Sequence, residues 1–348
     1  MNIKQLKIKG FKSIGEITLD SPNPFSVFVG ANGAGKSNIF EALEFLNFCN
    51  IMEPQEAVKF FGSVRDVANQ NLDSTNDFIE FEIDLGSIKP FLTLNPVLQN
   101  EKGSWGSYSF LDFGINFFKV HGQNLDDPDE ERFRYAKNPN YLQLANFTRL
   151  FVGKTSLLKK NTRDDSQLAL DASNLEKVLK RIFRNEIIKD EIIEILQLLI
   201  PGFDTIEVIS EELSSTDNLL VYEKSLKKPL SKRLISDGTF NILAILAAIY
   251  QSDKPQFLCI EEPENGLNPK VVRELVSIIR SKCKEHGHYI WLNTHSQTLV
   301  SELQPQEIIL VDKVNGLTQT KQINGMDLHG LKMDEALLTN SLGGGIPW

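Results

Sequence analysis

A glycine-rich loop between an apolar strand and a helix constrains this chain more than any other feature. In "FSVFVGANGAGKSNIFEALEFLNF", an apolar run at 25–29 precedes the loop, and apolar residues at 39, 43 and 46 follow it with helical spacing. Residues 30–37 fit the pattern G-x-x-x-x-G-K-S in the strand-loop-helix setting that a phosphate loop requires. Such a unit predicts an α/β fold.

Phosphate binding is predicted for the residues of this loop, which are Gly30, Ala31, Asn32, Gly33, Ala34, Gly35, Lys36 and Ser37. The glycines let backbone N–H groups converge on phosphate oxygens at a helix N-terminus, where the dipole favours anions. Lys36 would reach the β- and γ-phosphates, and the Ser37 hydroxyl would bind Mg²⁺. The alternative is a tight strand-helix turn with an incidental Lys-Ser pair. A dinucleotide fingerprint needs G-x-G-x-x-G, which this glycine order does not match.

A second apolar run ends in acidic residues. "FLCIEEPENGLNP" (257–269) places Glu261, Glu262 and Glu264 at the end of a predicted buried strand. Like charges there repel one another and resist desolvation, so a bound Mg²⁺ is expected to offset them. In a phosphate-loop site Glu261 would bind Mg²⁺, through water or directly, and Glu262 would orient and deprotonate the attacking water. The alternative is an exposed acidic turn.

A third strand, "YIWLNTHS" (289–296), also ends in polar residues. From this strand end His295 could hydrogen-bond a γ-phosphate. A lone histidine is more often structural, so this interpretation depends on the two other strand ends. His286 and His288 flank a glycine after a helix and are interpreted as turn residues rather than ligands.

The segment "LISDGTFN" (234–241) begins a long apolar helix and predicts a second anion site. Ser236 offers a hydroxyl there, and Gly238 leaves backbone N–H groups free at the positive end of the helix. One ATP has no use for two such cradles from one chain, whereas two chains arranged head to tail would use both. Simple capping of the helix by Ser236 or Asp237 is the alternative, and it is compatible with that role.

Hydrophobic patterns outline the rest of the fold. Three strands are predicted within residues 1–29, and further antiparallel strands over 78–85 and 108–120. One helix is predicted over 175–200, where Pro201-Gly202 would end it. Apolar strands that alternate with helices indicate a mostly parallel sheet joined to an antiparallel portion.

Two shorter signals place the C-terminal elements. Asn268 is the expected N-cap of the helix after the acidic strand, with Pro269 as its first residue and Gly287 at its end. A hairpin is predicted to turn at Asn315-Gly316. The final segment "LLTNSLGGGIPW" (337–348) is either a docking tail anchored by its tryptophan or a tail that folds back or frays.

Composition limits the classes of function. The net charge of −9 over 348 residues means that any DNA contact would have to be local. The longest apolar stretch, residues 240–250, is far shorter than the ~20 residues of a membrane span, and no signal peptide is recognised. Three cysteines without metal spacing fit a reducing compartment. A cytoplasmic protein without membrane partners is therefore expected.

Together, "KIKGFKSI…FVGANGAGKSNIFEAL", "SDGT", "IEEPENGLNP" and "NTHS" resemble the ABC-type ATPases of the SMC, RecF and OLD group. The chain looks closest to the stand-alone bacterial members often called AAA-type. The resemblance covers roughly residues 1–83 and 231–312 and implies an ATPase that uses ATP and Mg²⁺.

The resemblance also implies roles for particular residues. It adds Asn38 to the phosphate loop, makes Ser236 to Thr239 the signature motif and Asn265 to Asn268 the D-loop, and makes His295 the switch histidine. Arg65 and Lys12 are further candidates for nucleotide or DNA contact. The Q-loop glutamine could be Gln70 or Gln143.

Departures from the family pattern narrow the expectation. Glu261 stands where most ABC proteins have Asp, and "SDGT" replaces the "SGGQ" of transporter subunits. The OLD nucleases continue into a Toprim domain, whereas only about 50 residues follow His295. Residues 175–200 span under four heptads, so no coiled-coil arm is expected.

We therefore expect an α/β ABC-ATPase head with a mixed parallel and antiparallel sheet and a helical lobe. The core lobe would comprise residues 1–122 and 236–348, and the helical lobe 123–235. The expected function is an ATP-driven homodimer acting as a switch or clamp that controls an effector protein, encoded by a neighbouring gene, in a bacterial defence or DNA-associated system.

Two alternatives remain open at this point. The first is a DNA-binding repair clamp resembling RecF, with contacts from two basic clusters: Lys177, Lys180, Arg181 and Arg184, and Lys227, Lys228, Lys232 and Arg233. A solvated helix face and a lysine-rich loop would explain the same clusters. The second alternative is a nucleotide-binding scaffold without turnover.

Overall fold

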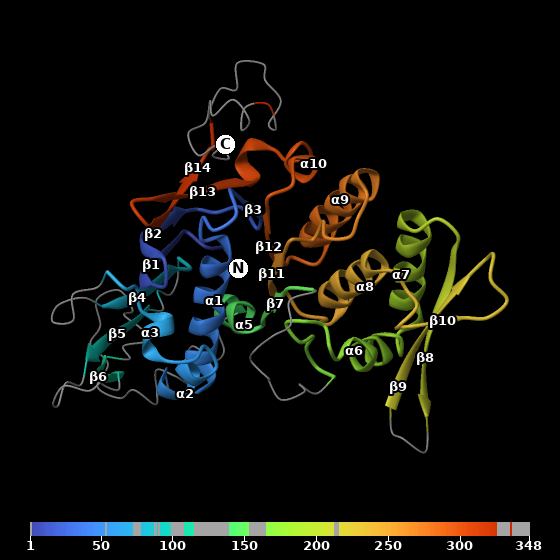
Figure 1. Cartoon of the computed structure of the whole chain (residues 1–348), viewed down its shortest axis with the longest axis horizontal. Coiled ribbons are helices and arrows are strands. Elements are labelled where there is room, and N and C mark those ends of the chain that lie inside the picture. The colour runs from blue at the N-terminus through green and yellow to red at the C-terminus, as the bar shows by residue number, and fades with distance from the viewer. Residues whose placement is uncertain are drawn as a thin grey trace. The chain divides into compact units, whose positions relative to one another are not determined.

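The computed structural model describes residues 2–52, 54–71, 78–86, 89, 91–98, 108–114, 139–152, 165–211, 216–325 and 335. Two compact units divide the chain. The first comprises Met1–Phe147 with Leu303–Trp348, and the second comprises Thr148–Glu302. Figure 1 shows their helices and strands.

The first unit contains a mixed sheet with the strand order β6-β5-β4-β1-β2-β14-β13-β3. Strand β13 pairs with β3, and β14 with β2, in parallel, while the other neighbours for which the register is known are antiparallel. The strands are β1 (Gln5–Phe11), β2 (Ile14–Asp20), β3 (Phe25–Val29), β4 (Ile79–Asp84), β5 (Phe91–Leu98), β6 (Tyr108–Gly114), β13 (Ile308–Val314) and β14 (Leu317–Gln322). The helices are α1 (Lys36–Ile51), α2 (Pro54–Lys59), α3 (Val64–Val67), α5 (Pro139–Ala145) and the 3-10 turn η1 (Pro305–Glu307).

Alternation along the strands produces the core of this unit. In β1 the side chains of Leu6 and Ile8 are buried, and the alternating Lys7 and Lys9 are partly exposed. Helix α1 adds Phe45, whose ring lies 5.6 Å from that of Phe11 and 6.0 Å from that of Phe81. These rings anchor α1, and therefore the loop before it, against the sheet.

The predicted hairpin is confirmed between β13 and β14. Asn315 and Gly316 adopt φ angles of 51° and 82°, as the turn of a tight hairpin requires. The three predicted N-terminal strands are confirmed as β1, β2 and β3.

The second unit contains a short sheet in the order β12-β11-β7 and a separate antiparallel sheet in the order β10-β9-β8. Strands β11 and β12 are parallel. The strands are β7 (Phe147–Leu150), β8 (Phe203–Glu211), β9 (Thr216–Glu223), β10 (Leu230–Ser231), β11 (Phe257–Glu261) and β12 (Tyr289–Thr294). The helices are α6 (Leu175–Ile182), α7 (Glu186–Leu199), α8 (Asp237–Tyr250), α9 (Pro269–Glu285) and α10 (Gln297–Val300). Helices α6 and α7 pack on the β8-β9 hairpin (Figure 1).

One prediction about this unit is wrong. The single helix expected over 175–200 is two helices, because Asn185 caps α7 by accepting hydrogen bonds from the backbone N–H groups of Ile187 and Ile188. His288, interpreted from the sequence as a turn residue, lies directly after the turn at His286 and Gly287 and before β12. It is 2 % exposed, and its ring nitrogens contact Gln256 and the carbonyl oxygen of Ile249.

The capping predictions for α9 are confirmed. The Asn268 side chain accepts from the N–H groups of Lys270 and Val271, and Pro269 is the first helical residue. Gly287 follows the helix with a φ of 65°. The predicted lobes remain a prediction, although the compact units group residues 236–302 with 148–235. The tail prediction for 337–348 lies outside the described residues. None of the described helices is long and apolar enough to cross a bilayer.

Candidate nucleotide site

The phosphate loop of the first unit has the strand-loop-helix geometry that its sequence predicts. All five residues of β3 are buried, and α1 begins at Lys36. Gly35 has a φ of 102°, and a Cβ on it would lie 1.9 Å from the hydroxyl oxygen of Thr318. A Cβ on Gly30 would lie 2.1 Å from the carbonyl oxygen of Val311. At both positions a side chain would clash with neighbouring atoms. At Gly35 the positive φ also favours glycine.

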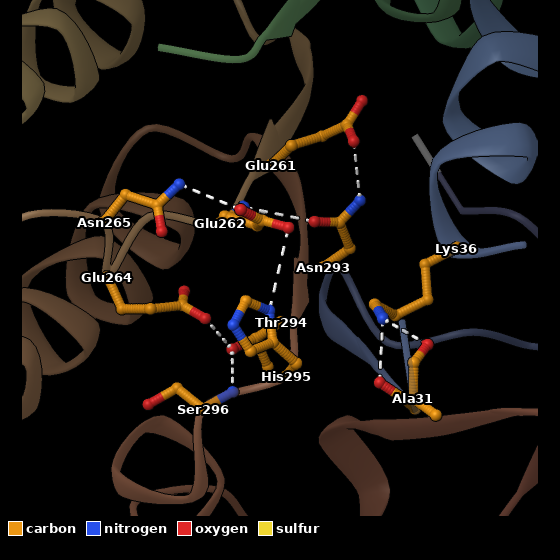
Figure 2. A network of polar contacts seen from close by, with 11 residues as sticks. Ala31, Lys36, Glu261, Glu262, Glu264, Asn265, Asn293, Thr294, His295 and Ser296 are labelled. Carbon is orange, nitrogen blue, oxygen red and sulfur yellow. Dashed lines mark hydrogen bonds and ion pairs between the residues drawn. The ribbon is translucent and has the colours of Figure 1, made fainter. Parts of the chain in front are cut away.

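Lys36 lies against the loop that precedes it. Its ammonium group donates to the carbonyl oxygens of Gly30 at 2.8 Å and Ala31 at 2.9 Å, and the residue is 7 % exposed. Figure 2 shows the contact with Ala31. A buried ammonium held at the loop can offer charge-assisted hydrogen bonds to phosphate oxygens.

A series of hydrogen bonds links the phosphate loop to residues outside its motif. The sequence did not predict most of these contacts. Asn38 donates its side-chain N–H to the Ser13 hydroxyl at 2.6 Å, Ser13 and Thr318 hydroxyls are 2.6 Å apart, and Thr318 donates to the carbonyl oxygen of Ala34 at 2.9 Å. Thr318 comes from β14, 284 positions after Ala34. Its only sequence signal is a threonine in a hairpin strand.

A cavity of about 430 Å³ opens in the same unit, and it collects several residues that the sequence left as candidates. Lys12, Arg65 and Gln70 line it together with Ser13 and Asn69. Lys12 also forms an ion pair with Glu41 of α1. Gln143, the other candidate for the Q-loop, lies in α5 and is 3 % exposed.

In the second unit, β11 carries Glu261 to the end of the strand, where it is fully buried. Arg149 of β7 contacts its Oε1 atom through Nε at 2.6 Å and Nη2 at 2.5 Å. The side-chain N–H of Asn293 donates to Oε2 at 3.0 Å. The sequence predicted that Mg²⁺ would supply the countercharge at this strand end, but an arginine supplies it to Glu261 within the chain.

Glu262 comes next and turns away from the strand with a φ of 46°. Its backbone N–H contacts the main-chain oxygen of Asn293 at 3.0 Å and the side-chain oxygen at 3.1 Å. Asn265 donates to its carboxylate at 2.9 Å, and the His295 Nδ1 atom lies 3.7 Å from the other carboxylate oxygen. These predicted residues are thus brought together at the ends of β11 and β12 (Figure 2).

Glu264 is the third acid of the cluster and has a different environment. The Thr294 hydroxyl donates to its Oε1 atom, while its buried Oε2 atom has no hydrogen-bond partner among the described residues. Burial raises the pKa of the Glu264 carboxyl above its usual range. This carboxyl is therefore more readily protonated than an exposed glutamic acid.

Helix α8 begins at the predicted signature motif. The Ser236 hydroxyl caps it by accepting from the Thr239 N–H at 3.1 Å, so the capping alternative is confirmed. A Cβ on Gly238 would lie 2.5 Å from the carbonyl oxygen of Gly266, and Asn241 donates to the carbonyl oxygens of Pro263 and Asn265. The start of α8 is thereby fixed against the loop that follows the acids.

The donors predicted for Mg²⁺ fit that ion by their chemistry. Mg²⁺ prefers oxygen ligands, which the Ser37 hydroxyl and the Glu261 carboxylate provide. Each carboxylate oxygen has two lone pairs, so the contacts with Arg149 and Asn293 leave Glu261 able to accept a further bond. Among the described residues, no group of three or more His, Cys, Asp and Glu side chains could hold a metal.

Comparisons with known proteins show which family and which relatives the chain resembles. The family model described as "AAA domain, putative AbiEii toxin, Type IV TA system" matches residues 25–301. An "ATP/GTP phosphatase" of Helicobacter pylori is 23 % identical over 343 residues, which cover 86 % of this chain and 87 % of that protein. The "DNA replication and repair protein RecF" of Porphyromonas gingivalis is 30 % identical over 183 residues, 48 % of each chain.

Solved structures show the fold. The Smc head bound to the C-winged helix domain of ScpA matches 92 % of this chain and 96 % of its own with a TM-score of 0.60 at 20 % identity. An Smc head with an extended coiled coil from Pyrococcus furiosus, bound to the C-terminal domain of ScpA, matches with a TM-score of 0.58 at 17 % identity and covers 98 % of this chain and 99 % of its own. The predicted α/β head of the ABC-ATPase type is confirmed.

Proposed function

Because the chain belongs to the AAA-domain family whose model spans residues 25–301, we propose that it hydrolyses ATP within a head-to-tail homodimer that acts as a molecular switch. The chain is an ATPase of the SMC, RecF and OLD type. Beyond this, we propose the homodimer, the roles of individual residues and the purpose of the switch.

Each residue of the site has a proposed role. The loop N–H groups from Gly30 to Asn38 and the Lys36 ammonium would bind the triphosphate, and Ser37 and Glu261 would hold Mg²⁺. That ion, when bound, neutralises charge on the phosphates. Glu262 takes a proton from the attacking water, and His295 donates a hydrogen bond to the γ-phosphate.

The environment of Glu262 is the observation that supports this mechanism most directly. Its side chain is 28 % exposed, so water can reach it, while Asn265 and the backbone contacts to Asn293 fix its position. A base must lie within reach of the proton it abstracts, and its geometry matters before its pKa. The cavity lined by Lys12, Arg65 and Gln70 is proposed to take the base and sugar of the same nucleotide.

The proposed dimer rests on the start of α8. Ser236 and Gly238 place a hydroxyl and helix N–H groups at a positive helix end, in addition to the phosphate loop at α1. In a head-to-tail arrangement this second anion site would contact the γ-phosphate bound by the other copy. ATP would then hold the two chains together, and hydrolysis would release them.

Light scattering of the Glu262→Gln form tests this proposal. With saturating Mg-ATP we expect a dimer, because an amide cannot take the proton and ATP persists. Adding Ser236→Arg should preserve ATP binding and abolish the dimer. The matched control is Ser281→Arg, the same substitution at an exposed serine of α9, which should still dimerise. A monomeric mass for Glu262→Gln in saturating Mg-ATP would refute the dimer.

We further propose that the switch controls an effector protein in a bacterial defence or DNA-associated system; the support is family membership. Three residues of the basic clusters proposed for the DNA clamp have partners within the chain. Lys180 pairs with Asp217 at 2.8 Å, Lys232 pairs with Glu176 at 2.8 Å, and Arg181 donates to three backbone carbonyls. A steep fall of DNA affinity with salt would favour the clamp instead, because each neutralised phosphate adds ~0.9 to the slope of log K against log salt concentration.

A further inference from the structure

Arg149 is buried in the second unit beside the acidic strand end, and no role in the reaction has been assigned to it. Its side chain is 3 % exposed, and its partner Glu261 has a fully buried carboxylate. Two of its nitrogens contact one oxygen of Glu261. Removing only one member of such a pair leaves an uncompensated charge in the interior.

The contacts continue from this pair to the proposed base. Arg149 holds Oε1 of Glu261, Asn293 donates to Oε2, and the side-chain oxygen of the same Asn293 accepts from the backbone N–H of Glu262. The Asn293 side-chain amide thus donates to Glu261 through its nitrogen and accepts from Glu262 through its oxygen. Every member of this series is buried or partly buried, so water competes little for the bonds.

The backbone of Glu262 needs such support. Its φ of 46° lies in the left-handed region, which is sterically unfavourable for a residue with a Cβ. Strained conformations persist only where surrounding contacts fix them. The double contact of its N–H with Asn293 supplies that fixation.

We propose that Arg149 is a positioning residue for ATP hydrolysis, which acts through Glu261 and Asn293 to hold the Glu262 backbone in its left-handed conformation. Arg149 itself does not touch the reacting atoms. It fixes the Glu261 side chain in the interior, so the Glu261 oxygen can orient the Asn293 amide. This inference rests on the proposed role of Glu262 as the base.

Arg149→Lys tests the proposal, because lysine keeps the charge but cannot offer two nitrogens in the fixed geometry of a guanidinium. We expect kcat to fall about tenfold or more, since small misplacements of a reacting group are costly, while the Kd for ADP stays within about threefold. In the nucleotide-free protein, hydrogen exchange of the backbone N–H of Glu262 should become faster.

Arg181→Lys is the matched control. Arg181 is also held by several bonds in this unit, to the carbonyl oxygens of Asp165, Ser166 and Gln251, but it has no contact with the acids. It should lower the melting temperature while kcat stays within about twofold and exchange at Glu262 is unchanged. The proposal is overturned if Arg149→Lys lowers kcat no more than Arg181→Lys does and leaves exchange at Glu262 unaltered.

Asn293→Ser interrupts the same series at its other end and leaves the Arg149–Glu261 pair intact. If Arg149→Lys does not fold, Asn293→Ser tests the positioning proposal in its place. Faster exchange at Glu262 with lower kcat supports the proposal, and wild-type values of both refute it. If Glu262→Gln turned over ATP at the wild-type rate, the assignment of the base would fail, whereas the exchange measurement would still test the positioning.

Discussion

The Thr318 hydroxyl donates a hydrogen bond to the carbonyl oxygen of Ala34 across 2.9 Å, although the two residues are 284 positions apart. The same hydroxyl lies 2.6 Å from that of Ser13, which accepts from the Asn38 side chain. The phosphate loop is therefore held from outside its own sequence motif, by a strand near the far end of the chain. Support of this kind fixes the loop before nucleotide arrives, which reduces the entropy lost on binding.

Thr318→Val should weaken ATP binding and lower thermal stability. Valine has the shape of threonine but leaves the Ala34 carbonyl and the Ser13 hydroxyl short of a partner, at a cost of about 1–3 kcal/mol. Calorimetric titration with ATP and a melting curve measure the two effects. Thr320→Val, on the same strand, is the control and should change neither. Unaltered affinity in Thr318→Val would mean that the loop holds its shape without this bond.

Gly35→Ala should be far more damaging than Gly33→Ala. Both glycines have positive φ, 102° and 79° respectively. A Cβ at position 33 meets nothing within 4 Å, whereas at position 35 it would lie 1.9 Å from the Thr318 hydroxyl oxygen. We expect a loss of about 1 kcal/mol for Gly33→Ala from backbone strain alone, and about 3 kcal/mol or more for Gly35→Ala.

Urea denaturation followed by circular dichroism measures both losses. Equal losses in the two variants would show that backbone conformation matters at Gly35 and that the contact with Thr318 does not.

The sequence predicted those parts of the site whose residues lie close together in the chain. The phosphate loop, the acidic strand end and the caps Ser236 and Asn268 each depend on residues within a few positions of one another. Local hydrogen bonds and dihedral preferences determine such features, so the pattern suffices.

Arg149, Ser13 and Thr318 escaped prediction for the opposite reason. Arg149 sits in a short buried strand and meets Glu261 112 positions later. Nothing near it in the sequence distinguishes it from a surface arginine, except the apolar residues around it in "NFTRLFV". The break before α7 was missed for another reason. Asn185 is a recognisable N-cap, but the helical pattern continues on both sides of it over 175–200 and indicated a single helix.

Glu264→Gln should stabilise the protein at pH 8 and lose that advantage near pH 5. The pKa of Glu264 is raised by burial, so the folded state holds its proton more tightly than the unfolded state does. Its contribution to stability is therefore most favourable at low pH and falls as pH rises through the folded pKa. Above that pH the wild type buries a charge whose Oε2 atom has no hydrogen-bond partner among the described residues, and glutamine removes the charge.

Melting temperatures of both proteins at the two pH values provide the measurement. Glu274→Gln, at an exposed position of α9, should have the same small effect at both. A lower melting temperature for Glu264→Gln at pH 8 would contradict the expectation and would indicate that the ionised carboxylate is needed for stability.

His288 should make the protein less stable in mild acid. Burial lowers the pKa of its imidazole to about 4, against an unfolded value of about 6.5. Nδ1 accepts from the Gln256 N–H, and Nε2 lies 3.2 Å from the carbonyl oxygen of Ile249, which suits the neutral ring. Because the unfolded state binds the proton more tightly, this stability is fully present above about pH 6.5. It is lost progressively as pH falls toward 4, by on the order of 3 kcal/mol in total.

Free energies of unfolding at pH 7.5, 6 and 5 check the size and sign of this effect. His288→Gln removes the titrating group, so its stability should fall less across this range than that of the wild type, even if it is less stable at pH 7.5. The neighbouring exposed His286 provides the control. Its charge also lowers the pKa of His288, but burial is the larger cause, so His286→Gln should keep most of the decline. Parallel declines in His288→Gln and the wild type would place the acid sensitivity elsewhere, in the carboxylates that are ion-paired in the folded state.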